Sequence, residues 1–103
     1  MVPARLIEDF ARRVAQVSKP DRIVLFGSHA YGDPADDSDV DILVVLPFEG
    51  KAWKKAAEIR MSVRAGFPLD LIVRTPEEFA ERVAAGDPFF QEVAAKGKVL
   101  YGA

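Results

Sequence analysis

Two aspartates, Asp39 and Asp41, stand at the start of an apolar segment that continues to Leu46. In extended chain, residues separated by one position project to the same face, so these carboxylates lie about 6 to 7 Å apart at Cα. Two negative charges at that distance repel each other by about 3 kcal/mol at an effective dielectric constant near 20. A fold that places them on a strand needs a cation or water between them, so the pair is a candidate metal site.

A third carboxylate, Asp70, interrupts another apolar segment between Leu69 and Leu71. The pattern predicts a strand here with a buried carboxylate in it, and an isolated buried charge is too costly to be incidental. If the strands that carry Asp41 and Asp70 are neighbours, three carboxylates face one point. Such a set of hard oxygen ligands suits Mg²⁺, with Mn²⁺ as the alternative.

A glycine and a serine, Gly27 and Ser28, follow the apolar segment 23–26. Glycine lets the backbone approach a ligand closely, and a turn that enters a short helix at Ser28 directs amide N–H groups towards an anion. Ser38 either binds phosphate or caps its loop, and neither role is favoured. Amide groups that can bind phosphate, next to carboxylates that can bind metal, suit a metal-bound nucleoside triphosphate. In such a site one ion activates the attacking hydroxyl and another neutralises the leaving pyrophosphate.

The elements that must position these residues can be predicted from hydrophobic periodicity and from start and stop signals. Helices are expected at residues 2–17, 51–65, 76–85 and 88–96, and strands at 23–26, 40–46, 69–74 and 99–101. Thr75 followed by Pro76, with Glu78 completing a capping box, and Asp87 followed by Pro88 are helix starts. This order predicts one α/β (α+β) domain over residues 1–103, with a small mixed β-sheet flanked by helices.

The composition limits the classes of function. The chain has 103 residues, no cysteine, 50% hydrophobic and 29% charged residues, and a net charge of −2. It therefore has no thiolate metal site and no cysteine nucleophile, and direct binding to nucleic acid is not expected. No apolar run is long enough for a membrane helix, and the first residues lack the pattern of a secretory signal, so we expect a cytoplasmic protein. Five basic residues of the predicted helix 51–65 are interpreted as a solvated face: Lys51, Lys54, Lys55, Arg60 and Arg64.

Taken together, Gly27-Ser28, ten intervening residues, the Asp39-x-Asp41 pair and the later strand residue Asp70 resemble the nucleotidyltransferase superfamily typified by polymerase β and kanamycin nucleotidyltransferase. The small size and the C-terminal pattern "TPEEF…GKVLY" are most similar to the minimal nucleotidyltransferases, the antitoxin-like partners of HEPN-domain proteins. The resemblance implies a polymerase β-like nucleotidyltransferase fold. It also implies phosphate contacts at Gly27, Ser28 and Ser38, and two Mg²⁺ ions held by Asp39, Asp41 and Asp70.

The function implied by this resemblance is Mg²⁺-dependent transfer of AMP from ATP to a hydroxyl of a partner protein, a tyrosine of a HEPN toxin, within a toxin–antitoxin pair. Asp70 would align or deprotonate the acceptor. A homo- or hetero-oligomer is expected. The alternative is a catalytically weak nucleotide-binding module that neutralises a HEPN ribonuclease by contact alone, because Tyr31 stands where minimal members often have arginine. An antibiotic-modifying enzyme is a weaker third interpretation, since no acceptor domain is evident.

Other residues are given simpler interpretations. An EF-hand and a Walker-type phosphate loop do not match the residues around Gly27 and Asp41. His29 is expected to be solvated rather than catalytic. Trp53 and the pair Phe89-Phe90 are expected to be in the core or half-buried. Three further aspartates are interpreted as loop residues: Asp33, Asp36 and Asp37.

Overall fold

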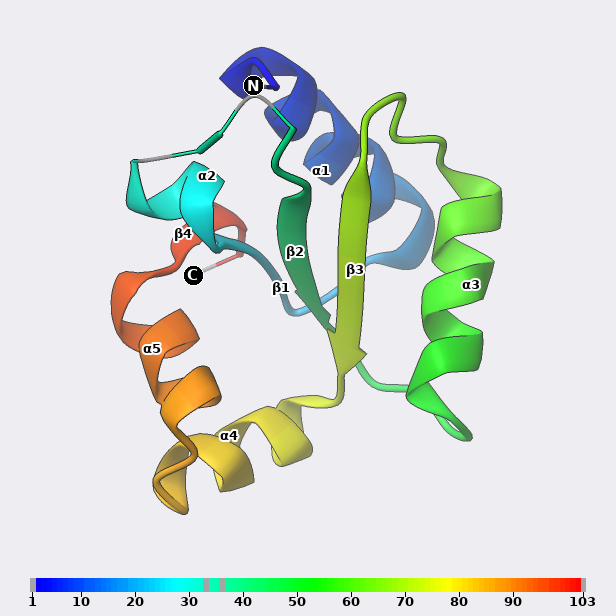
Figure 1. Ribbon diagram of the computed structural model, residues 1–103. Coiled ribbons are helices and arrows are strands. Elements are labelled where there is room, and N and C mark those ends of the chain that lie inside the picture. Colours follow the sequence, from blue (N-terminus) through cyan, green and yellow to red (C-terminus); the bar gives the residue numbers. More distant parts are fainter. Residues whose placement is uncertain (1, 33, 36, 103) are drawn as a thin grey trace.

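The computed structural model describes residues 2–32, 34–35 and 37–102 (Figure 1). The helices are α1 (Ala4–Ser18), α2 (Ser28–Tyr31), α3 (Ala52–Ser62), α4 (Pro76–Ala84) and α5 (Pro88–Lys96). The strands are β1 (Arg22–Phe26), β2 (Val40–Val45), β3 (Leu69–Arg74) and β4 (Lys98–Tyr101). The predicted element order is confirmed, and the short helix expected at Ser28 is α2.

The strands form one mixed sheet in the order β3-β2-β1-β4. β1 runs antiparallel to β2 and to β4, whereas β2 and β3 are parallel. The parallel pair needs a crossover connection, and α3 supplies it. β3 and β4 are therefore the two edges of the sheet.

Helices pack on both faces of the sheet (Figure 1). Ile42 and Val44 of β2 belong to the core formed with α1 and α3. The alternating residues Leu43 and Val45 belong to a second core, to which α4 and α5 contribute. Hence β2 is buried on both faces along most of its length, as a central strand should be. No helix in the described part of the chain is long and apolar enough to cross a membrane.

The predicted helix starts are confirmed at α4 and α5. Thr75 Oγ1 accepts a hydrogen bond from the backbone N–H of Glu78 at 3.1 Å, and Asp87 Oδ1 accepts one from the N–H of Phe89 at 3.0 Å. The reciprocal hydrogen bond of the predicted capping box is not found among the described residues, where the Glu78 carboxylate lies 3.9 Å from the guanidinium groups of Arg74 and Arg82. Helix α3 ends three residues earlier than predicted, since Val63 is extended and buries its side chain.

Candidate active site

Asp41 of β2 lies directly opposite Asp70 of β3 in the parallel ladder. Residues in register on neighbouring strands project to the same face, and for this pair it is the face on which α4 and α5 pack. The prediction that the strands carrying these two residues are neighbours is confirmed. Asp39 and Asp70 are exposed and Asp41 is half-buried.

The prediction that Asp70 is buried within its strand is wrong. β3 is an edge strand, and Leu71 and Val73 supply its buried residues on the α1 and α3 face. Asp70 projects to the opposite face, where its side chain is exposed. The carboxylate is therefore accessible to a ligand and does not depend on a buried counter-charge.

Gly27 brings the turn after β1 against Asp41. Phe26 pairs with Asp41 across β1 and β2, and Gly27 follows with φ 73° and ψ −162°, a combination that is almost confined to glycine. A Cβ at this position would overlap Oδ2 of Asp41. The Asp41 carboxylate therefore lies between the Gly27 turn on one side and Asp70 on the other.

Helix α2 makes a single turn that starts at Ser28. The N–H groups of Ala30 and Tyr31 both donate to the Gly27 carbonyl at 3.0 Å. Within the described residues, the N–H groups of Ser28 and His29 have no such acceptor. These are the amide groups that the sequence predicts to face an anion.

Ser38 closes its own loop. Its Oγ accepts a hydrogen bond from the N–H of Ala35 at 2.9 Å, and its N–H donates to the Ala35 carbonyl at 3.1 Å. These two hydrogen bonds correspond to the loop-capping role, one of the two roles considered for Ser38. Asp37 lies in a turn, as expected, whereas Asp33 and Asp36 lie outside the described residues.

The pKa of Asp41 is raised above the ordinary value for an aspartate. The largest cause is burial, followed by repulsion from Asp70 and from Asp39, and a side-chain hydrogen bond with Asp70 acts in the same direction. His29 opposes the shift by lowering the pKa. Asp41 therefore experiences the charge of both neighbouring carboxylates, and a bound cation would relieve that repulsion.

The oxygen donors and the excess negative charge of this cluster suit a hard divalent cation such as Mg²⁺. In the parts of the chain that the structure describes, however, no three His, Cys, Asp or Glu side chains are close enough to form a complete metal-binding group. Asp39, Asp41 and Asp70 thus fit a metal in chemistry and charge, and the side chains of Asp39 and Asp70 are exposed.

Helix α5 contributes residues to this site that were not predicted from the sequence. A hollow of about 270 Å³ next to Asp41 is lined by Phe26, Gly27, Tyr31, Asp41, Phe89, Glu92 and Val93. Phe89 is 39% exposed and packs edge-to-face on Phe26 with the ring centres 5.3 Å apart. Its position beside the carboxylates gives the site an aromatic wall. Sequence spacing could not reveal this contact, because α5 follows the carboxylates by many residues.

Two simpler interpretations of the sequence are corrected. His29 is not freely solvated: its Nδ1 is buried without a hydrogen-bond partner among the described residues, and its Nε2 accepts a 3.4 Å bond from the N–H of Val2. Trp53 is 66% exposed and does not pack in the core. The expectation is confirmed for Phe90, which is 5% exposed.

The chain is similar to several known proteins. The family described as "Nucleotidyltransferase domain" matches residues 5–101. The chain is 30% identical over 70 residues to "Putative protein adenylyltransferase MJ0141" of Methanocaldococcus jannaschii, an alignment that covers 66% of this chain and 71% of that protein. It is also 30% identical over 82 residues to "Putative protein adenylyltransferase MJ0604" of the same organism, covering 78% and 77% of the two chains.

Two solved structures are similar to the whole fold. A "putative nucleotidyltransferase" from Sulfolobus solfataricus superposes with a TM-score of 0.67 at 25% identity, covering 95% of this chain and 78% of that chain. A mutant of the toxin–antitoxin MntA–HpeT superposes with a TM-score of 0.59 at 20% identity, covering 93% and 73%. At 20% identity the second likeness bears on the fold alone.

Proposed function

Since this chain belongs to the nucleotidyltransferase domain family, we propose that it transfers AMP from ATP to a hydroxyl group of a partner protein. One observation carries the proposal: Asp41 lies between the Gly27 turn and the in-register Asp70. This places a backbone turn that can face phosphate beside carboxylates that can hold metal. The arrangement supports binding of a metal-bound triphosphate.

The roles follow from position. Asp39, Asp41 and Asp70 would hold two Mg²⁺ ions, or Mn²⁺ in their place. Gly27, Ser28 and Ser38 would contact the nucleotide phosphates, with Ser38 also keeping its loop closed. When bound, the ions would neutralise charge on the triphosphate and lower the pKa of the attacking hydroxyl.

The chemical step is a displacement at the α-phosphorus. Asp70 is the carboxylate on the edge strand, so it faces an approaching acceptor and takes up the hydroxyl proton. The acceptor oxygen forms a bond to the α-phosphorus, and the bond from this phosphorus to the oxygen that bridges it to the β-phosphorus breaks. Pyrophosphate leaves with the electron pair, and AMP stays on the acceptor.

The names of the relatives support a protein as the acceptor, since both are given as protein adenylyltransferases. A similar fold occurs in the toxin–antitoxin MntA–HpeT. We infer that the partner is a HEPN-domain toxin, that the acceptor is one of its tyrosines, and that this chain acts as the antitoxin in a hetero-oligomer.

The test uses the purified chain together with the protein encoded beside it. With Mg²⁺ and ATP labelled at the α-phosphate, label should become covalently attached to the partner protein. It should stay absent with ATP labelled at the γ-phosphate, because pyrophosphate leaves. The Asp41→Asn variant should transfer no label, whereas Asp37→Asn, in the exposed turn, should transfer at the wild-type rate. Absence of labelling by the wild-type protein would contradict the proposal.

A second candidate, neutralisation of the toxin by contact alone, is favoured by one observation. Tyr31, which lines the hollow beside Asp41, offers no positive charge to the nucleotide phosphates. In that case the Asp39→Ala variant would protect a toxin ribonuclease as well as the wild-type chain does. Loss of protection by a variant that still binds the toxin would favour modification instead.

A further inference from the structure

The outer edge of β3 and the adjoining side of α3 form an open groove. A hollow of about 350 Å³ lies there, lined by Ala52, Trp53, Ala56, Leu71, Ile72, Val73 and Arg74. Trp53 is the largest side chain of this set and is 66% exposed. The groove runs along the same strand that carries Asp70.

The backbone of β3 is open to a further strand at its centre. Val40 N–H donates to the Pro68 carbonyl, and Leu46 N–H donates to the Arg74 carbonyl. In a parallel ladder this pattern directs the backbone N–H and C=O groups of every second β3 residue away from β2. Leu71 is one of these residues. No hydrogen bond to another element is found for the Leu71 backbone among the described residues. Leu71 can therefore accept from and donate to one residue of an added antiparallel strand.

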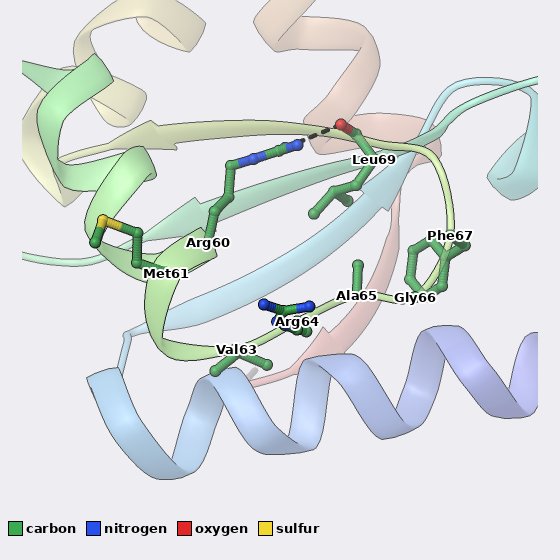
Figure 2. A pocket seen from close by; sticks show the side chains of 8 residues that line it. All are labelled: Arg60, Met61, Val63, Arg64, Ala65, Gly66, Phe67 and Leu69. Atoms are coloured by element: carbon green, nitrogen blue, oxygen red, sulfur yellow. Dashed lines mark hydrogen bonds between the residues drawn. The ribbon is translucent and has the colours of Figure 1, made fainter.

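The two ends of this open stretch are already occupied by arginines. Arg60 of α3 donates to the Leu69 carbonyl at 3.0 Å, as Figure 2 shows, and Arg74 donates to the Val73 carbonyl at 2.8 Å. These contacts limit an added strand to a short pairing centred on Leu71. They also hold two guanidinium groups at the ends of the groove, and that of Arg74 lies 3.9 Å from the Glu78 carboxylate.

The segment that forms the α3 side of the groove is basic although the whole chain has a net charge of −2. Residues 51–64 contain five Lys or Arg residues and a single acidic residue, Glu58. Lys54 lies over the Trp53 ring with its Nζ 5.6 Å from the ring centre. At the other end, Arg60 and Arg64 line a larger hollow of about 630 Å³ that contains none of the three carboxylates (Figure 2). This charge is complementary to an acidic ligand.

We propose that the β3 edge binds an extended acidic segment of the partner protein as an added strand, and that this segment delivers the acceptor hydroxyl to Asp70. The residue paired with Leu71 would place its side chain on the α3 side, against Trp53 and Ala56. Its neighbour in the segment would pair with Asp70, and its side chain would project to the same face as Asp41 and Asp70. The segment should thus alternate an apolar residue with a hydroxyl-bearing residue. This inference rests on the proposed function.

The test uses the full chain and a fluorescent peptide with a central tyrosine between two leucines and three glutamates at each end. We expect the peptide to bind and its affinity to fall as salt is raised. The bound peptide should protect the backbone amides of Leu71 and Val73 from hydrogen exchange. Trp53→Ala should weaken binding by about tenfold or more, because an exposed aromatic anchor is lost. Lys54→Glu should weaken it too. Val99→Ala, on the opposite edge strand β4, is the matched control and should have no effect.

Two altered peptides and one oligonucleotide complete the test. A peptide with methylated leucine amides, which cannot donate to the strand, and one with lysines in place of glutamates should both fail to bind. The proposal is overturned if the acidic peptide does not bind at 1 mM, if Trp53→Ala and Val99→Ala behave alike, or if a single-stranded oligonucleotide binds this edge instead.

Stabilisation by Mg²⁺ and ATP is measured in parallel. If that stabilisation is present while the peptide fails, the docking surface alone is wrong, and if it is absent, the proposed function fails.

Discussion

Gly27 and Asp41 are packed so closely that a Cβ on Gly27 would overlap Oδ2 of Asp41. The turn that follows β1 and the carboxylate on β2 therefore form one structural unit, although 13 positions separate them in the sequence. Glycine is required here for two reasons, since φ is 73° and there is no room for a side chain. A change at this turn should affect the carboxylate directly.

Gly27→Ala should lower the free energy of unfolding by about 1 to 3 kcal/mol from backbone strain and should displace the Asp41 side chain. Nucleotide-dependent stabilisation should be lost as well. Urea denaturation and thermal melting with Mg²⁺ and ATP measure the two effects. Gly50→Ala is the matched control, because Gly50 has φ 86° but open space around it. If the two variants are equally destabilised and both still bind nucleotide, the close contact with Asp41 has no functional role.

Asp41→Asn should stabilise the metal-free protein at neutral pH. The pKa of Asp41 is raised in the folded state, mainly by burial and then by Asp70 and Asp39. Such a carboxyl group contributes stability below its unfolded pKa of about 3.9, and this contribution is lost as the pH rises through the folded pKa. The asparagine carries no charge, so it avoids that loss.

Melting temperatures of the metal-free Asp41→Asn and wild-type proteins, measured with chelator present from pH 3 to pH 8, test this sign. The variant should melt close to the wild type at pH 3 and above it at pH 7 to 8. Asp37→Asn in the exposed turn should show no such divergence. A variant less stable than the wild type at neutral pH would mean that the Asp41 charge is compensated within the protein.

The sequence predicted the central part of the fold well because the signals there are local. The apolar run of β2, the glycine after β1 and the caps at Thr75 and Asp87 each act within a few residues. The predicted fold, a small mixed sheet flanked by helices as in nucleotidyltransferases, is confirmed. The expectation that Asp41 and Asp70 are neighbours is confirmed as well.

Burial was harder to predict than strand position, because it depends on which helices cover each face. Asp70 and Trp53 are both exposed, since β3 is an edge strand with which no further strand pairs in the part of the chain that the structure describes. Phe89 was missed as a lining residue for the same reason. Its approach to Asp41 is set by how α5 packs on the sheet, which no spacing within α5 encodes.

Mg²⁺ or Mn²⁺ should raise the melting temperature of the wild-type protein, and ATP should raise it further. A ligand present at 100 times its Kd adds about 2.7 kcal/mol to the stability of the state that binds it. For a chain of this size, 1 kcal/mol corresponds to about 4 to 8 °C. Asp39→Ala should lose most of the shift while folding normally, because Asp39 is exposed. An unchanged shift in this variant would remove Asp39 from the proposed metal ligands.

Asp70→Asn separates nucleotide binding from transfer. Asp70 is exposed on the edge strand β3, so its replacement should leave the fold and its stability nearly unchanged. Gly27, Asp39 and Asp41 remain, and nucleotide affinity should therefore fall only modestly. The rate of transfer should fall by about 10² to 10⁴, because the group proposed to take the acceptor proton is missing. The two halves are measured by calorimetric titration with ATP and Mg²⁺ and by transfer of α-labelled AMP to the partner protein. If transfer is retained, another group takes up the acceptor proton. If nucleotide binding and transfer are both lost, Asp70 acts primarily as a metal ligand.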